Sequence, residues 1–310
     1  MKDSVLCCIF AFGYLGDNVI NLHSVTVMKE RFILKFFLLA IAASLFCIGC
    51  KSGHNQGFDT YSVAGQRSFL LVSKNGHFPF AGDTIGLVNS FNLVWPCPGK
   101  MTSEAEHELL VRYFGDTEAK DIDQVASVWL DDVSIYDEDE VRIVKVDTLP
   151  DTMEYSYSKI EGTCSSDGVV ACFMIGKSNY EVGSAHMLYT AEYVNVDVRS
   201  GNVIHLSDLV DTTVLGEVLY RAVNGLEVNK SVRESLFDEY VQSETLPLSN
   251  DFIIDGAGRT ITVNYQVYDI APYAYGIQSV VLPLDWLFGQ VTVTDYARSL
   301  MEEMKGDESL

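Results

Sequence analysis

Apolar and polar residues alternate most clearly near the C-terminal end of the chain. Ile261, Val263 and Tyr265 are separated by Thr and Asn, the period of a strand with one buried face. A second apolar run follows at 277–282, and the segment 269–276 between them contains a proline, two tyrosines and a glycine. Such residues favour a rigid, shaped loop over a two-residue hairpin turn. Its tyrosines either bury their rings and bond locally or form a recognition surface.

The strand period, together with the helical period of apolar residues, predicts the other strands and helices. Strand patterns occur at 67–72, 89–95, 141–146, 189–198 and 252–254, with a hairpin over 153–180 that turns at Asp167-Gly168. Helical patterns occur after capping boxes at Ser103 and Ser231, after Asp211 as far as Gly225, and over 294–304. Because hairpins pair the strands and the helices fall in separate blocks, the sequence predicts an α+β fold with antiparallel sheets and packed helices.

Residues 1–49 have the pattern of a signal peptide region. A basic stretch that starts at Met28 precedes an apolar run at 36–48, and this run ends in small residues. The next residue is Cys50, and the sequence Cys-Ile-Gly-Cys resembles a bacterial lipobox, whose final cysteine is acylated. We expect translation to start at Met28, Cys50 to carry the lipid, and the polar, glycine-rich residues 50–66 to form a flexible tether.

The net charge of the chain limits the classes of molecule that the protein can bind. Residues 1–49 hold four basic and three acidic groups, which leaves 17 basic and 40 acidic groups and a net charge of −23 from Cys50 onward. Such a field repels nucleic acid and anionic membrane surfaces and steers cationic partners toward the protein. The alternative explanation of the acidic composition is that it only keeps an exported protein soluble. No later apolar run is long enough to span a bilayer, so we expect the lipid to be the only membrane anchor.

Two cysteines flank a predicted turn. Cys164 and Cys172 lie on either side of Asp167-Gly168, and an exported chain can oxidise them. A three-residue loop would place the two cysteines opposite each other and allow a disulfide, whereas a two-residue turn would put their sulfurs on opposite faces. Cys97, between two prolines, is expected to be a buried or half-buried thiol.

Catalytic motifs are scarce. The chain lacks a Gly-x-Ser-x-Gly elbow, a phosphate loop, a dinucleotide fingerprint and a zinc-binding His-Glu-x-x-His helix. Six carboxylates within 131–140 lack the glycine and final glutamate of an EF-hand loop, which favours a solvated loop. His186 lies in a glycine-rich setting with Tyr189 nearby, but a lone histidine is usually structural. We expect no catalytic residue, no metal site and no cofactor.

Several segments together resemble a known family. Gly183-Ser184-Ala185-His186, Leu206-Ser207-Asp208-Leu209 and the segment from Tyr268 to Gly276 look like the C-terminal domain of RsiV-like proteins. That domain is the extracellular part of RsiV-type anti-sigma factors, accompanies polysaccharide deacetylases, and occurs in stand-alone bacterial lipoproteins of unknown function. The resemblance is good over 153–290 and weaker over 67–150, and Ser184 replaces a glycine of the family pattern. It implies two intimately associated lobes that are non-catalytic and that recognise lysozyme in the anti-sigma branch.

The resemblance also implies a domain plan. An N-terminal α/β lobe would occupy 67–190 and the RsiV-like C-terminal lobe 191–310. Only residues 1–31 precede the apolar run, too few for a cytoplasmic sigma-binding domain, and too few residues follow 290 for a deacetylase. We therefore expect a stand-alone lipoprotein of the bacterial cell envelope, anchored by its lipid in the outer membrane.

The expected function is non-enzymatic binding of a cationic cell-wall hydrolase such as lysozyme, or of cell-wall glycan. We place the site on the loop 269–276 and the turn 183–186, with these residues: His186, Tyr189, Asp269, Tyr273 and Tyr275. In an extended backbone the last two tyrosines would point the same way. The competing hypothesis is an envelope hydrolase acting on cell-wall glycan, which a deep cleft with two carboxylates or a metal site would favour.

Overall fold

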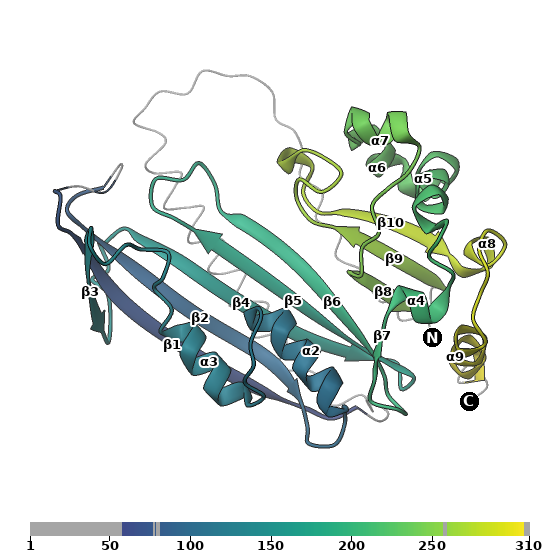
Figure 1. Ribbon diagram of the computed structural model, residues 1–310, viewed down its shortest axis with the longest axis horizontal. Coiled ribbons are helices and arrows are strands. Elements are labelled where there is room, and N and C mark those ends of the chain that lie inside the picture. Colours follow the sequence, from purple (N-terminus) through teal and green to yellow (C-terminus); the bar gives the residue numbers. More distant parts are fainter. Residues whose placement is uncertain (1–57, 77, 79–80, 257–258, 307–310) are drawn as a thin grey trace, which may run out of the picture. The chain divides into compact units, whose positions relative to one another are not determined.

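The computed structural model describes residues 58–76, 78, 81–256 and 259–306. The expected signal region, Cys50 and most of the expected tether lie outside these residues. The described chain forms a seven-stranded sheet, a three-stranded sheet and several helices (Figure 1), which confirms the predicted α+β fold. No helix among these residues is long and apolar enough to cross a membrane.

The seven-stranded sheet has the order β3-β1-β2-β4-β5-β6-β7. Its strands are β1 (Thr60–Ser73), β2 (Thr84–Pro96), β3 (Val141–Val146), β4 (Tyr155–Ser166), β5 (Val170–Tyr180), β6 (Leu188–Asp197) and β7 (Val203–Ile204). All neighbours are antiparallel except β2 and β4, which pair in parallel. The helices α2 and α3 and the strand β3 lie between β2 and β4 in the sequence, so this pair has the long connection that a parallel ladder requires.

The first two strands are longer than their patterns predict. β1 begins at Thr60, so the part of the expected tether from this residue onward is strand, and its ladder with β2 runs from the pair Thr60 and Pro96 to the pair Val72 and Thr84. Phe58 anchors the start of the strand, because it is 4% exposed and its ring packs edge-on against Phe173 of β5. Burial of this ring keeps the polar start of β1 on the sheet.

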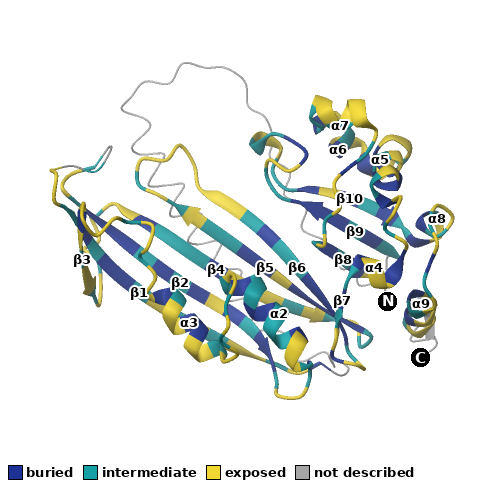
Figure 2. Cartoon of the chain, viewed as in Figure 1, coloured by how far each residue is buried: buried dark blue, intermediate teal, exposed yellow. Residues whose placement is uncertain are grey.

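Two helices cover one face of this sheet (Figures 1 and 2). They are α2 (Ser103–Phe114), which the capping box predicts, and α3 (Ile122–Leu130), which is not among the predicted helices. The N-cap of α2 is Thr102 rather than Ser103, since the Thr102 side chain accepts a hydrogen bond from the backbone N–H of Ala105. The core between helices and sheet includes Leu109, Leu110, Tyr113, Val125, Phe91, Phe173, Ile175 and Val194.

The opposite face of the sheet, here called the open face, carries residues that alternate with those of the core. They include Ser90 on β2, Lys159 on β4 and Ser178 on β5. Because β3 lies beside β1 whereas the next strand, β4, lies beside β2, the chain has to cross β1 and β2 between them. Residues 147–153, here called the strap, make this crossing.

The three-stranded sheet has the order β10-β9-β8 and is antiparallel. Its strands are β8 (Phe252–Asp255), β9 (Thr260–Tyr265) and β10 (Gln278–Pro283). The helices of this lobe are α4 (Leu206–Leu209), α5 (Leu215–Gly225), α6 (Lys230–Ser235), α7 (Asp238–Ser243), α8 (Leu284–Leu287) and α9 (Asp295–Gly306). The apolar stripe of α5, which includes Val218, Leu219 and Ala222, packs in the core with Ile261, Val280 and Leu282.

Two boundaries differ from those expected. The helix predicted from Ser231 is split into α6 and α7, because Leu236 and Phe237 between them have extended ψ angles of 142° and 146°. The lobe boundary expected between residues 190 and 191 falls inside β6, and the first sheet continues through this strand to β7.

The structure contradicts the Cys164–Cys172 disulfide. Residues 167–169 connect β4 to β5. The ladder between these strands starts at the pair Ser166 and Ala171, so it pairs Cys164 with Phe173 and Ser165 with Cys172. This register places the two sulfurs on opposite faces of the sheet, and both cysteines are free. Burial raises the pKa of both thiols to about 12. Cys97 is a half-buried free thiol, as expected.

Candidate functional site

The loop between β9 and β10 has the ordered shape that its composition predicts. Pro272 has φ −58°, and Gly276 adopts φ 69°, a conformation open mainly to glycine. The Gln278 amide donates to the carbonyl of Tyr275 at 2.8 Å, and the Tyr240 hydroxyl of α7 donates to the carbonyl of Asp269 at 2.9 Å. Neighbouring elements of the same lobe thus hold both ends of the loop.

Two predicted residues from distant parts of the sequence meet here. His186, in the connection between β5 and β6, stacks on Tyr273 with ring centroids 3.9 Å apart and an interplanar angle of 20°. The Tyr273 hydroxyl also donates a hydrogen bond of 2.5 Å to the carbonyl of Met187. The structure therefore brings the turn 183–186 and the loop 269–276 together, as expected, while a ligand-binding role for them stays a prediction.

The expectation that Tyr273 and Tyr275 point the same way is wrong. Tyr273–Tyr275 is a single turn of 3₁₀ helix, in which side chains two residues apart are separated by about two-thirds of a turn. Tyr273 is half-buried against His186, whereas Tyr275 is 58% exposed. Tyr268 is 55% exposed, has φ 72°, and its ring centroid lies 5.6 Å from that of Tyr273. The loop thus carries two exposed rings, Tyr268 and Tyr275, and one fixed ring, Tyr273.

The remaining two predicted residues have local roles. One carboxylate oxygen of Asp269 accepts from the backbone N–H of Gln266 at 2.7 Å, which closes the turn that starts the loop, although the residue as a whole is exposed. Tyr189 lies on the open face beside Gly176 of β5, where a methyl group on the glycine would come within 3.3 Å of the tyrosine hydroxyl. Burial raises the pKa of Tyr189.

Sequence reasoning missed the tyrosines that continue this surface onto the open face. The Tyr157 hydroxyl lies 3.3 Å from the Met187 sulfur, and the Tyr157 ring lies 5.8 Å from that of Tyr180 and 6.4 Å from that of Tyr155. We call this set the aromatic array: Tyr155, Tyr157, Tyr180, His186, Tyr268 and Tyr273. The available signal was the Tyr-Ser-Tyr period at 155–157, which places two rings on one face of a strand.

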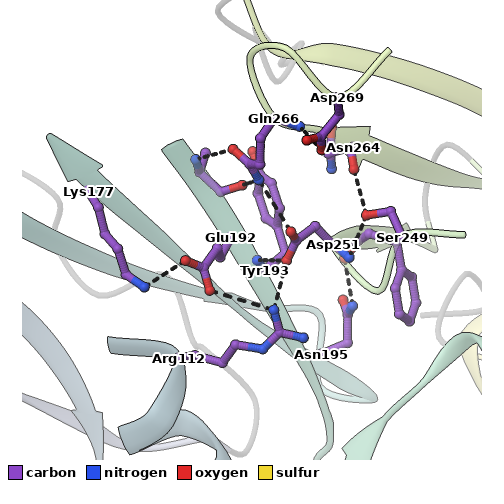
Figure 3. A network of polar contacts seen from close by, with 12 residues as sticks. Arg112, Lys177, Glu192, Tyr193, Asn195, Ser249, Asp251, Asn264, Gln266 and Asp269 are labelled. Atoms are coloured by element: carbon purple, nitrogen blue, oxygen red, sulfur yellow. Dashed lines mark hydrogen bonds and ion pairs between the residues drawn. The ribbon is translucent and has the colours of Figure 1, made fainter. Parts of the chain in front are cut away.

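A network of charged and polar groups joins the two lobes (Figure 3). Arg112 of α2 lies 3.6 Å from a carboxylate oxygen of Glu192 and 3.3 Å from one of Asp251. Lys177 contacts the other Glu192 oxygen at 2.6 Å, and the Gln266 amide donates to the other Asp251 oxygen at 3.2 Å. All four carboxylate oxygens are engaged, which is the pattern of a structural junction. Burial raises the pKa of Asp251, while Arg112 opposes the shift.

Three side-chain amides act as substitutes for a neighbouring strand. The Gln266 amide accepts from the backbone N–H of Ala191 at 2.9 Å and donates to its carbonyl at 2.6 Å, on the free edge of β6 (Figure 3). Asn195 of β6 bonds in the same way to the Ile254 N–H and the Phe252 carbonyl of β8. Asn229 does so at Val281 of β10. Each amide satisfies backbone groups that an edge strand would otherwise leave open.

Among the residues that the structure describes, no group of three or more histidine, cysteine, aspartate or glutamate side chains is arranged to hold a metal ion. The six carboxylates of 131–140 belong to the connection between α3 and β3, which also contains turns. In this segment one Asp137 oxygen accepts from the N–H of Asp139 at 2.8 Å. Lys145 of β3 pairs with Asp131 at 2.8 Å. The segment is a solvated connection, as its spacing indicates.

Comparison with known proteins gives a family match without a function. Residues 224–285 match the family described as "Protein of unknown function (DUF3298)", a region that runs from the end of α5 to α8 and includes the loop 269–276. A crystal structure of a DUF3298 family member from Bacteroides fragilis is similar to this chain, with 18% identity and a TM-score of 0.54, over 81% of this chain and 99% of that one. A DUF3298 family protein from Pseudomonas aeruginosa is 14% identical with a TM-score of 0.48, over 79% and 98% of the two chains. No curated protein matches. The Bacteroides likeness supports the fold alone.

Proposed function

We propose that this protein is a non-enzymatic lipoprotein of the bacterial cell envelope that binds a cationic protein, of the kind of lysozyme, at the second-lobe end of the aromatic array. The observation that carries the proposal is the pair of exposed rings, Tyr268 and Tyr275, on the same loop as Tyr273, which is fixed by its stack on His186. Exposed tyrosines held on an ordered loop offer large contact areas at a small entropy cost.

Charge and resemblance support the choice of ligand. The net charge of −23 from Cys50 onward attracts a basic protein and raises its association rate. The resemblance of residues 153–290 to the RsiV-like ectodomain implies recognition of lysozyme, and the family match over 224–285 is compatible with this link. Cell-wall glycan, which aromatic rings also bind, is the alternative ligand for the same surface.

The hydrolase hypothesis finds less support. It requires two carboxylates that are free to act as acid and base or nucleophile beside a bound sugar. The close pair at the lobe junction, Glu192 and Asp251, has its four oxygens engaged by Arg112, Lys177, Tyr193 and Gln266. A protonated or nucleophilic role would have to break this network first.

Binding of hen lysozyme to the wild-type protein and to a Tyr268→Ala/Tyr275→Ala variant tests the proposal. Both rings are more than half exposed, so we expect the melting temperature to stay unchanged while the affinity falls at least about tenfold, or ~1.4 kcal/mol. Tyr61→Ala, which removes a 43% exposed ring from β1, is the matched control and should bind like the wild type. Equal binding by all three proteins, or no saturable binding by the wild type, contradicts the proposed site.

The anchor requires a separate test, because Cys50 lies outside the described residues. Mass spectrometry of the native N-terminus should find an acylated Cys50, and Cys50→Ala should leave the protein unprocessed or released from the membrane fraction. An unmodified mature N-terminus at another residue contradicts the lipoprotein proposal without affecting the binding site.

A further inference from the structure

The strap creates a pocket on the open face of the seven-stranded sheet. Its floor is formed by Gln66 and Ser68 of β1 and Val88 of β2, with Tyr155 of β4 at the side. The wall is the strap itself, and these residues of it line the pocket: Asp147, Thr148, Leu149, Pro150, Asp151 and Met153. The cavity volume is 380 Å³, within the range of about 300–1,000 Å³ that is usual for small-molecule sites.

The strap is held to the sheet by specific contacts. The backbone N–H of Gly86 donates at 2.9 Å to the carbonyl of Glu154, the residue directly after the strap. The N–H of Met153 donates to the carbonyl of Pro150 at 3.0 Å, which forms a turn in the strap. Leu149 lies over Gly86, whose missing side chain makes room for it: a methyl group there would collide with the leucine. The pocket wall therefore exists before a ligand arrives.

The polar residues of the pocket define the chemistry of a ligand. Gln66, Ser68 and Thr148 supply amide and hydroxyl groups, which both donate and accept hydrogen bonds. Asp147 and Asp151 are exposed carboxylates, and no lysine, arginine or histidine is among the described residues that line the pocket. This combination suits a ligand rich in hydroxyl groups that carries positive charge, and it repels phosphates and uronic acids.

Tyr155 adds an aromatic face at the pocket mouth. It is 48% exposed, and its ring centroid lies 6.4 Å from that of Tyr157, the next member of the aromatic array. An exposed ring beside polar groups can pack against the apolar face of a pyranose and attract a nearby ammonium group.

We propose that the strap pocket binds an amino sugar with a free, protonated amine, as in a glucosamine unit of a glycan. The sugar ring packs on Tyr155, its hydroxyl groups bond to Gln66, Ser68 and Thr148, and Asp147 and Asp151 together attract its ammonium group, so that loss of either charge weakens binding. The proposal does not depend on lysozyme binding, because the strap pocket shares no residue with the proposed protein-binding end of the array.

Calorimetric titration of the full chain with glucosamine tetramer, its N-acetylated counterpart and a galacturonic acid trimer tests the charge preference. We expect saturable binding of the glucosamine tetramer, about tenfold weaker binding of the N-acetylated tetramer and no binding of the acidic trimer. Equal affinity for the first two, preference for the acidic trimer, or no saturable binding of the glucosamine tetramer overturns the proposal.

Variants locate the site. Asp151→Asn should weaken binding of the glucosamine tetramer about tenfold and leave the N-acetylated tetramer unaffected, while Tyr155→Ala should weaken both. The exposed Asp116→Asn is the charge-matched control and Tyr61→Ala the ring-matched one, and both should bind like the wild type. A melting temperature equal to that of the wild type shows that each variant is folded. Wild-type affinity in both pocket variants refutes the site, whereas unchanged sugar binding in Tyr268→Ala/Tyr275→Ala separates it from the protein-binding proposal.

Discussion

Replacing Gln266 with leucine tests the idea that one amide holds the second lobe to the free edge of β6. Leucine has a similar size, so the main loss is three hydrogen bonds: two to the backbone of Ala191 and one to Asp251. Ala191 is only 4% exposed, so its N–H and carbonyl would be left without a partner in a place that water reaches poorly.

The expected magnitude follows from these groups. An unsatisfied buried donor or acceptor costs about 1–3 kcal/mol, so the two backbone groups of Ala191 together cost about 2–6 kcal/mol. The bond to Asp251 adds little, because Arg112 still faces that carboxylate. For a protein of this size a loss of ~3 kcal/mol lowers the melting temperature by about 6–12 °C.

Urea and thermal unfolding followed by circular dichroism measure the change, and hydrogen exchange at the Ala191 amide reports the bond directly. Gln242→Leu on α7 is the matched control, because this residue is exposed, and it should stay within about 0.5 kcal/mol of the wild type. If Gln266→Leu is no less stable than Gln242→Leu, the amide does not hold the lobes together and the reasoning fails.

Three further predictions concern backbone and charge. Gly276→Ala should lower the free energy of unfolding by about 1–3 kcal/mol through its φ of 69° and ψ of −162° alone, since no atom lies within 4 Å of the new methyl group. The control is Gly225→Ala, which has equal space and no positive φ and should cost no stability in the same melting assay. Burial raises the pKa of Asp251, so the contribution of this carboxyl to stability is full below its unfolded pKa of about 4 and is lost as pH rises through the folded pKa. The melting temperature of the wild type relative to that of Asp251→Asn should therefore fall between acidic and neutral pH. A difference that stays constant with pH would contradict the shift. A hydrogen bond from Lys145 lowers the pKa of Asp131, so Lys145→Met should raise the pKa of Asp131 in an NMR titration. Stability should change by less than about 0.5 kcal/mol, because the pair is exposed to solvent. An unchanged pKa would show that the pair does not form in solution.

The local pattern of apolar and polar residues was enough to predict most helices and strands of this chain and the ordered loop 269–276. The alternation at Ile261 and Val263 gives β9, the spacing of Leu109 and Tyr113 gives α2, and Pro272 and Gly276 give an ordered loop. The start of β1 was missed because serine, alanine and glycine there provide little contrast between the two faces. Its place in the sheet depends on pairing with β2 and on the burial of Phe58, which the local sequence does not show.

The candidate site, too, was predictable from the sequence only in part. Its residue types are visible in the sequence, but their partners come from other elements. His186 stacks on Tyr273, 87 positions later, and Tyr157 of β4 lies beside Met187 in the connection between β5 and β6. The direction of Tyr275 was wrong because a 3₁₀ turn replaced the extended backbone. The strap pocket depends on the strand order β3-β1-β2-β4, which no local periodicity encodes.

The parallel ladder between β2 and β4 also sets an order of folding. It joins two groups of strands, β3-β1-β2 and β4-β5-β6-β7, whose internal pairs include two hairpins that close over short connections. Residues 86–92 pair with residues 155–161, so the ladder must close a far longer segment, and such non-local contacts form slowly. We therefore expect the β1–β2 and β4–β5 hairpins to gain hydrogen-exchange protection before the β2–β4 ladder in pulse-labelled refolding. Until that ladder closes, the facing edges of β2 and β4 are open to other chains, so refolding yield should fall as protein concentration rises.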